Sequence, residues 1–292
     1  MRGGPPYGPG GSRVSILYFS GTGGTKLVAE LLGEILSESR KCDVAGIGDA
    51  SAVEAAAGAE FLLLCYPTYY LGPPPSMREF VLRLGPFDPP RRAYVVTTCE
   101  LYSENSIRRL ALMLRERGIL LAGSKVIRAP GSDATAVFPS VIVPWLYRFE
   151  KRLPEKLRAI AREVIAVSEV RDPRESIPPP QWYTPFTRSL QNLLDGFDIF
   201  RYRMRVLPKR CVLCGACVKS CDRKAWEMGE GRLVHSGERC ELCCRCLHRC
   251  PRRAIVLVRW LKDNRRLDAW LYARLGAEAR ESLGLGAREE SR

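Results

Sequence analysis

The sequence predicts an α/β protein, a doubly wound parallel sheet followed by a small, cysteine-rich α+β domain. Short apolar runs alternate with amphipathic stretches through the first 170 residues, which is typical of a parallel sheet with helices on both faces. Nine of the 12 cysteines lie within residues 211–250. The 292 residues suffice for two domains, and a hydrophobic share of 46% indicates a globular chain.

Each expected strand is a short apolar run of the kind that a parallel sheet buries on both faces. These runs are at 13–19, 42–47, 60–66, 93–99 and 125–129. Helices are expected at 26–39, 76–84 and 105–118, where apolar residues recur at helical spacing. A further helix is expected within 144–170, broken or started near Pro154.

The chain divides into five expected segments. They are a disordered tail at 1–12, the sheet domain at 13–170, a Pro-rich and helical connector at 171–205, the cysteine-rich domain at 206–258, and a C-terminal helix and tail at 259–292. The last helix has apolar residues at helical spacing, which predicts packing on one of the domains or docking to a partner or membrane surface. These residues are Trp260, Leu267, Trp270, Leu271 and Leu275.

The composition bears on location and on the state of the thiols. No apolar run approaches the length of a membrane helix, and the first residues, MRGGPPYGPGG, lack the apolar region of a signal peptide. We therefore expect a cytoplasmic protein without a transmembrane segment. Because thiols are kept reduced in that compartment, a disulfide framework is disfavoured.

The cysteines of the second domain form two runs with one spacing, C-x2-C-x2-C-x3-C. The first run is Cys211, Cys214, Cys217 and Cys221; the second, 29 residues later, is Cys240, Cys243, Cys246 and Cys250, followed by Pro251. This is the bacterial pattern for two [4Fe–4S] clusters, in which the fourth cysteine of each run binds the other cluster. The predicted ligand sets are therefore Cys211, Cys214, Cys217 and Cys250 for cluster one, and Cys240, Cys243, Cys246 and Cys221 for cluster two.

Zinc is the alternative metal. Zinc sites usually take two C-x2-C pairs, so two triplets with trailing cysteines exceed what one zinc ion needs. Cys244 is out of register and is expected to be a bystander thiol. Asp222 stands where the first run would usually have proline, which places a carboxylate near one cluster.

The loop after the first strand carries the second chemical signal. The segment SGTGGT lacks both the Gly-Lys-Ser/Thr ending of a Walker A loop and the third glycine of G-x-G-x-x-G. Small hydroxyls and free amides at a helix start suit a phosphate monoester, and hence FMN better than a dinucleotide. The residues are Ser20, Gly21, Thr22, Gly23, Gly24 and Thr25. A glycine-rich turn with an ordinary helix cap is the alternative.

The segment YFSGTGGT resembles the phosphate loop S/T-x-T-G-x-T of flavodoxins, with Gly24 where asparagine is common. The resemblance implies the strand order 2-1-3-4-5 and a flavin ring held by the loops after the third and fourth strands, here 66–75 and 97–105. Cys99 there is either a reactive thiol or a small buried residue. The implied ring contacts are Pro67, Thr68, Tyr69, Tyr70, Thr98, Cys99 and Tyr102.

Over residues 13–258 the chain resembles the flavodoxin–ferredoxin fusion proteins of anaerobic bacteria and archaea. The resemblance rests on FSGTGGT, YPTYYLGPPP and the two cysteine runs. It implies electron transfer between two [4Fe–4S] clusters and FMN, and it supplies no substrate. We expect electrons to enter at the clusters from reduced ferredoxin, because no second Gly-rich loop suggests a nicotinamide-nucleotide site.

The formal net charge is +14, and residues 199–292 hold 22 Lys and Arg against 11 Asp and Glu. This excess favours an acidic redox partner such as a small ferredoxin. No motif for specific nucleic-acid recognition is present. Two alternatives to an electron-transfer protein are a flavin-dependent reductase of a small molecule such as a quinone, and a binding protein with structural clusters.

Overall fold

The computed structural model describes residues 13–103, 105–170, 175–183, 185–186, 189 and 204–285. Its main sheet has five parallel strands in the order β2-β1-β3-β4-β5. The strands are β1 (Val14–Tyr18), β2 (Cys42–Gly46), β3 (Phe61–Pro67), β4 (Arg91–Cys99) and β5 (Ile119–Arg128). This is the flavodoxin-like order, so the predicted fold class is confirmed.

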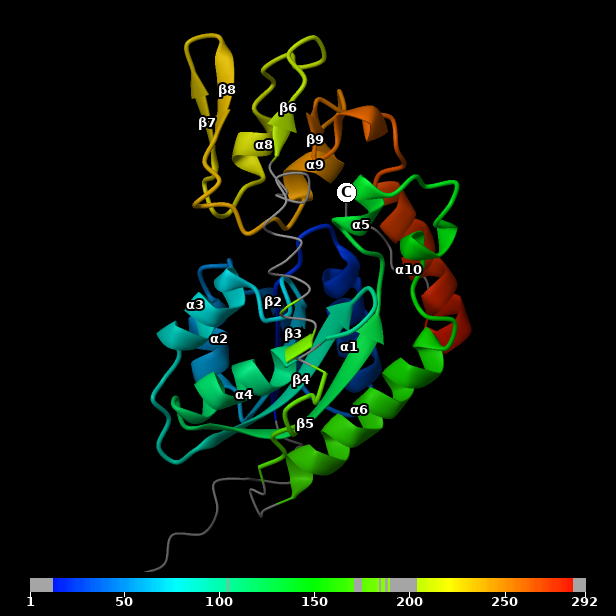
Figure 1. Ribbon diagram of the computed structural model, residues 1–292. Coiled ribbons are helices and arrows are strands. Elements are labelled where there is room, and N and C mark those ends of the chain that lie inside the picture. Colours follow the sequence, from blue (N-terminus) through cyan, green and yellow to red (C-terminus); the bar gives the residue numbers. More distant parts are fainter. Residues whose placement is uncertain are drawn as a thin grey trace, which may run out of the picture.

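Helices cover both faces of the sheet (Figure 1). One face packs against α1 (Gly24–Ser37) and α6 (Leu153–Glu169), and the other against α2 (Ala52–Gly58), α3 (Pro75–Arg83) and α4 (Ser106–Arg115). Successive residues of β1 alternate between the two cores, with Ile16 in the first and Leu17 in the second. Because both faces are covered, the strands are apolar throughout rather than alternating.

Strand β5 is longer than the sequence predicts, starting at Ile119 rather than at 125. Gly123 interrupts the apolar run there, so the sequence pattern predicted that the strand begins only after this glycine. The structure gives the reason: the ring of Tyr94 lies over Gly123, and an added Cβ would be 2.6 Å from it. The ladder between β4 and β5 shifts register at Ala93 and Tyr94. Glycine is therefore needed where this ring crosses the strand.

The cysteine-rich part has two small antiparallel pairs and two short helices, at the upper end of the molecule in Figure 1. Strand β6 (Arg205–Val206) pairs with β9 (Ile255–Val256), and β7 (Trp226–Gly229) pairs with β8 (Arg232–His235). The helices are α8 (Ala216–Lys219) and α9 (Arg245–Arg249). Met204, Trp226, Leu247 and Ile255 are buried in its core.

After β9 the chain returns to the sheet domain. Strand β9 is followed by η2 (Arg259–Leu261) and then by α10 (Ala269–Leu283), which packs on α1 and α6. Earlier in the chain, the short helices α5 (Ala134–Val137) and η1 (Pro144–Tyr147) lie between β5 and α6. Leu267 and Leu271 are buried, whereas Trp260 and Trp270 face solvent. The predicted apolar face is thus only partly correct. Asp268 caps the helix, so Trp260 precedes it and does not share its period.

The predicted tail at 1–12, most of the predicted connector helix at 187–200 and the last residues, 286–292, lie outside the described residues. Among the residues that are described, no helix combines the length and apolarity needed to cross a bilayer.

Candidate functional site

The loop between β1 and α1 contains the predicted phosphate-binding residues 20–25 and is called the phosphate loop below. Gly23 caps α1 with φ at +131°, a conformation that needs glycine. Its amide donates to the Ser20 hydroxyl at 3.1 Å. The Thr25 hydroxyl, buried in the first turn, meets the Thr98 hydroxyl at 2.7 Å. Residues from the two predicted halves of the flavin site are therefore in direct contact.

The Thr22 hydroxyl has a partner that sequence analysis did not find. Its oxygen lies 3.0 Å from the hydroxyl oxygen of Tyr272, which comes from α10. The amide of Gly24 also donates to that phenolic oxygen, and the Tyr272 ring lies against Gly23, 2.9 Å from where a Cβ would be. A helix that begins 245 residues after Gly24 thus covers the phosphate loop. No local sequence signal could have predicted this contact.

A cavity of about 260 Å³ lies beyond the phosphate loop, at the carboxyl ends of β3 and β4. It is lined by all the residues predicted to contact a flavin ring: Pro67, Thr68, Tyr69, Tyr70, Thr98, Cys99 and Tyr102. Tyr70 and Tyr102 are about half exposed at its rim. In a parallel sheet this edge is where ligands bind, next to the switch point between β1 and β3.

A tight two-residue turn shapes one wall of the cavity. Tyr69 and Gly72 exchange both backbone hydrogen bonds at 2.9 Å. Tyr70 and Leu71 between them have φ of 45° and 60°, a left-handed conformation that is costly for residues with large side chains. Backbone strain of this kind concentrates at functional sites, which agrees with the position of the turn beside the cavity.

The cavity also contains two carboxylates that sequence analysis missed. Glu100 directly follows β4 and its carboxyl packs against Gly131, while Asp133 lies on the facing loop. The pKa of Glu100 is raised to about 7, mainly by burial and also by the nearby Asp133, while Arg128 opposes the shift. Glu100 can therefore hold or release a proton at this wall near neutral pH.

Cys99 is buried at the end of β4. Burial raises the pKa of its thiol to about 11, with only partial compensation from Arg128 and Lys156. At neutral pH the side chain is therefore a thiol, which is a poor nucleophile. This favours the buried-residue alternative over a reactive cysteine.

The structure brings together the four cysteines of the first predicted set. Cys211, Cys214, Cys217 and Cys250 line one small cavity, together with Ile255 and other apolar residues. Burial raises the pKa of the Cys217 thiol, and the nearby Cys250 and Cys211 raise it further. The fourth cysteine of the second run is thus next to the triplet of the first.

The cysteines of the second predicted set also lie near one another. Burial raises the pKa of Cys246, and Cys243, Cys240 and Cys221 add to that shift through their charges. Cys221 belongs to the first run, so the fourth cysteine of each run lies near the triplet of the other, as predicted for the ligands of two clusters. In the described part of the chain, no three His, Cys, Asp or Glu side chains converge as ligands of a single metal ion.

The two runs repeat each other in backbone geometry as well as in sequence. Equivalent residues 29 positions apart take the same left-handed conformation, namely Leu213 and Leu242, Gly215 and Cys244, and Lys224 and Arg253. Equivalent amides, of Ala225 and Ala254, donate to the sulfurs of Cys221 and Cys250 at 3.3 and 3.2 Å. Amide donors to sulfur are one of the means by which proteins set cluster potentials.

Cys244 takes the position of Gly215 in this repeat. It is buried, and its sulfur points to the carbonyl oxygen of Leu242 at 3.3 Å. Burial raises the pKa of its thiol well above the ordinary value. Its side chain is therefore held by backbone.

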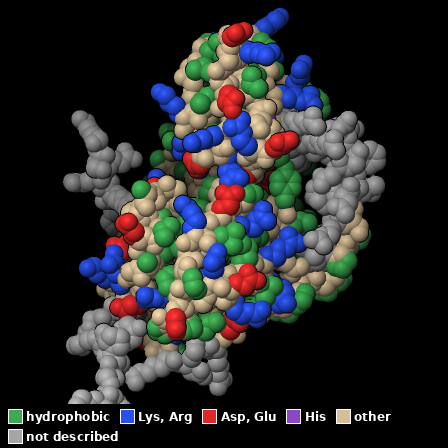
Figure 2. Space-filling model, turned by 90° about the vertical axis from the view of Figure 1, so that its left-hand side faces the viewer, with side chains coloured by type: hydrophobic (Ala, Val, Ile, Leu, Met, Phe, Trp, Pro, Cys, Tyr) green, Lys and Arg blue, Asp and Glu red, His purple; other side chains and the backbone are tan. Residues whose placement is uncertain are grey.

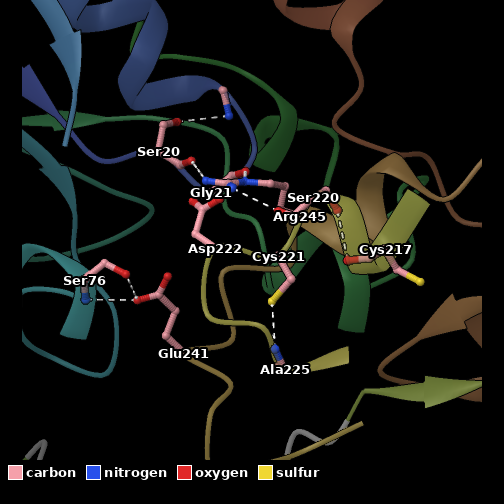
Figure 3. Close-up of polar contacts among 11 residues, drawn as sticks. Ser20, Gly21, Ser76, Cys217, Ser220, Cys221, Asp222, Ala225, Glu241 and Arg245 are labelled. Atoms are coloured by element: carbon pink, nitrogen blue, oxygen red, sulfur yellow. Dashed lines mark hydrogen bonds and ion pairs between the residues drawn. The ribbon is translucent and has the colours of Figure 1, made fainter. Parts of the chain in front are cut away.

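Arg245 joins the phosphate loop to both cysteine runs (Figure 3). Its guanidinium donates to the carbonyl oxygens of Gly21 at 3.0 Å, Ser20 at 2.8 Å and Ser220 at 3.0 Å. It also pairs with Asp222 at 2.5 Å. The aspartate that replaces the usual proline is thus the counter-charge of the arginine that docks the two units.

Two further polar contacts cross the same junction. The Glu241 carboxylate accepts from the amide and hydroxyl of Ser76, at 3.2 and 2.8 Å (Figure 3). His248 on α9 accepts from the Leu267 amide at Nδ1, so Nε2 carries the proton and donates to the Ser132 carbonyl at 2.8 Å. His248 is therefore a buried packing residue that ties three segments together.

At Gly21 the backbones of the two halves approach each other closely. A Cβ there would lie 2.5 Å from the carbonyl oxygen of Cys243 and 3.1 Å from its Cβ, and it would also meet the Tyr69 hydroxyl. Only a hydrogen atom fits between the phosphate loop and this cysteine. The junction therefore places one member of the second cysteine set directly beside the predicted flavin site.

No family model and no curated protein matches the chain. Among solved structures it is similar to an archaeal flavodoxin, with 18% identity, TM-score 0.39, and coverage of 54% of this chain and 96% of that one. A flavodoxin of Streptococcus pneumoniae TIGR4 has 18% identity and a TM-score of 0.40, covering 53% of this chain and 99% of that one. Oxidised flavodoxin 1 of Bacillus cereus has 17% identity and a TM-score of 0.41, covering 53% of this chain and 98% of that one. These similarities concern the fold alone.

Replacing Arg245 with methionine should destabilise the protein by about 2–4 kcal/mol, because three carbonyl oxygens and a carboxylate lose their charged donor. Asp222→Pro should cost less than about 1 kcal/mol, since Asp222 is exposed and the three carbonyl bonds remain. Urea denaturation of both variants tests this, with the exposed Arg249→Met on the same helix as control. Equal losses in Arg245→Met and Arg249→Met would contradict the docking role.

Glu100→Gln should make stability less dependent on pH. Because the pKa of Glu100 is raised to about 7 in the folded protein, the folded state binds more protons than the unfolded state between about pH 4.5 and 7. Stability from this group is then lost as pH rises through that window, by about 1–3 kcal/mol. Denaturation at pH 5 and pH 8 measures the loss, with the exposed Glu116→Gln as control. Parallel pH profiles for wild type and Glu100→Gln would refute the raised pKa.

Proposed function

We propose that the protein is an iron–sulfur flavoprotein that carries electrons between two [4Fe–4S] clusters and FMN. The observation that supports this most directly is the contact at Gly21, where the loop proposed to bind the flavin phosphate touches Cys243 of the second cysteine set. A chain that merely stored clusters for structure would have no reason to place a cluster ligand against such a loop.

The cysteines suit clusters better than a single ion. Each set has four thiols, three from one run and one from the other, and the first set lines one cavity. A four-iron cluster takes one thiolate at each iron, so its ligands surround a volume rather than meet at a point.

A buried cation beside the first set supports a negatively charged occupant. Arg266 is buried, and its Nε has no hydrogen-bond partner among the described residues. Burial lowers its pKa, and the nearby Cys250 opposes that shift. A cluster with its thiolates would supply the counter-charge that this guanidinium lacks.

The phosphate loop suits an oxygen ligand. The Thr22 hydroxyl and the Gly24 amide meet at one oxygen atom, that of Tyr272, at the start of a helix. The cavity beyond offers polar groups, tyrosines and Glu100 to a flavin ring. When bound, FMN would store two electrons, whereas each cluster passes one. Glu100 is then placed to exchange a proton at the ring side of the site.

The exposure of the cysteines gives a direction to the proposed path. Cys214 of the first set is exposed, whereas Cys243 of the second set faces the phosphate loop. Electrons from a partner would enter at the first set and leave through the second. Exposed Lys219, Arg249 and Arg252 lie near the first set and would attract an acidic partner such as reduced ferredoxin. On the face shown in Figure 2, basic and acidic side chains are interspersed.

Anaerobically purified protein should contain eight iron atoms per chain, and Cys244→Ala should retain all eight, because its sulfur is bonded to backbone. Cys221→Ala should damage the cluster of the second run and leave the other intact. Iron analysis with low-temperature spectroscopy of each variant measures this. Loss of a cluster from Cys244→Ala, or damage confined to the first set in Cys221→Ala, would disprove the ligand assignment.

The released flavin should be FMN, and reduced ferredoxin should reduce the protein quickly while NADPH alone reduces it slowly. Full reduction should take about four electrons, one for each cluster and two for FMN. Higher salt should slow the ferredoxin reaction if basic residues steer docking. Chromatography and anaerobic rapid mixing test these points. Fast reduction by NADPH without a partner would favour the alternative of a self-sufficient reductase of a small molecule.

A further inference from the structure

Tyr272 occupies the phosphate loop from inside the protein. Its phenolic oxygen is hydrogen-bonded to the Thr22 hydroxyl at 3.0 Å and to the amide of Gly24, and its ring lies against Gly23. These are donors that a phosphate monoester would need at the start of α1. One oxygen atom cannot share that position with another, so the tyrosine and a phosphate exclude each other.

The position of Tyr272 is fixed by the docking of α10. Leu271 and Leu283 of this helix are buried against the core around α1, and Gly276 lets the helix approach Leu27 closely. Arg280 binds the Glu34 carboxylate with three hydrogen bonds of 2.9–3.2 Å. Tyr272 itself is only 9% exposed. The hydroxyl is therefore held in the loop by a whole helix and not by a chance rotamer.

The occupant is neutral whereas a phosphate is not. Burial raises the pKa of Tyr272 to about 12, so the phenol is protonated at neutral pH. It satisfies the Thr22 and Gly24 donors without bringing charge to the helix start. A phosphate dianion would interact more strongly with the same donors and with the helix dipole. The exchange of phenol for phosphate is thus favourable but must be preceded by loss of the existing contacts.

Resting on the proposed flavin site, we propose that Tyr272 is a specificity residue that lowers the selectivity of this site for phosphorylated over unphosphorylated flavin. FMN can bind fully only when the Tyr272 hydroxyl leaves the phosphate loop. Riboflavin has no phosphate and can occupy the ring cavity while the tyrosine stays in place and keeps the loop donors paired. Tyr272 in the flavin-free protein therefore weakens the binding of FMN but not that of riboflavin.

Titration of the FMN-free protein, with its clusters retained, by FMN and by riboflavin tests this inference. Tyr272→Ala should bind FMN about tenfold more tightly than wild type, because the binding-competent fraction rises. Riboflavin affinity should change less than about twofold. Tyr272→Phe keeps the ring but loses the hydroxyl, so its FMN affinity should lie between those of wild type and Tyr272→Ala. Trp270→Ala, an exposed residue of the same helix, is the matched control and should change neither affinity.

Rapid mixing gives a second readout. In wild type the rate of FMN binding should level off at high FMN concentration, because departure of Tyr272 limits it, whereas in Tyr272→Ala it should rise linearly. Equal FMN affinities in wild type and Tyr272→Ala, or weaker binding in the variant, would overturn this inference and leave the flavin proposal standing. Failure of both flavins to bind any of the proteins would overturn the flavin proposal, and this inference with it.

Discussion

One guanidinium holds the two halves of the molecule in register. Arg245 lies between two predicted cluster ligands of the second run, Cys243 and Cys246, and it donates to the carbonyls of Ser20, Gly21 and Ser220. These carbonyls turn toward the junction because the phosphate loop and the first cysteine run both bend there. Without a donor they would be buried and unpaired, which is costly. Arg245 therefore contributes strongly, together with the Ser76–Glu241 contact, to the proximity of Cys243 and Gly21 on which the proposed electron path rests.

Several residues of the cysteine runs have a left-handed backbone conformation, and the strain of these residues must be offset elsewhere in the structure. Leu213, Leu242, Lys224 and Arg253 carry side chains where glycine would be easier. The same segments direct the amides of Ala225 and Ala254 toward the sulfurs of Cys221 and Cys250. The clusters proposed above would help to offset this strain.

The sequence predicted the features that have a local or periodic signal. The strand order, with the flavodoxin-like edge at β3 and β4, agrees with the structure. The two cysteine ligand sets stay predictions, although members of each set lie near one another. The sequence did not reveal Arg245, Glu100 or Tyr272. Arg245 is one of many arginines in a basic chain, and its importance comes from a loop more than 220 residues away. Glu100 follows an apolar strand, as many solvated carboxylates do. Tyr272 lies on an ordinary amphipathic helix, and only the tertiary packing brings its hydroxyl to Thr22.

The return of the chain after β9 bears on how freely the cysteine-rich domain can rock. A domain joined through one linker can usually rotate about it. Here the chain leaving β9 passes His248, which fixes the Leu267 amide, and continues into α10, which is anchored by Arg280 on α1. The domain is therefore tethered at its exit as well as at its entrance. Such a double tether restricts hinge motion. It keeps the local concentration of Cys243 at the phosphate loop high even when the hydrogen bonds of Arg245 to that loop break. Contact between Cys243 and the phosphate loop is then a property of the folded chain, and not an encounter that two separate domains must repeat.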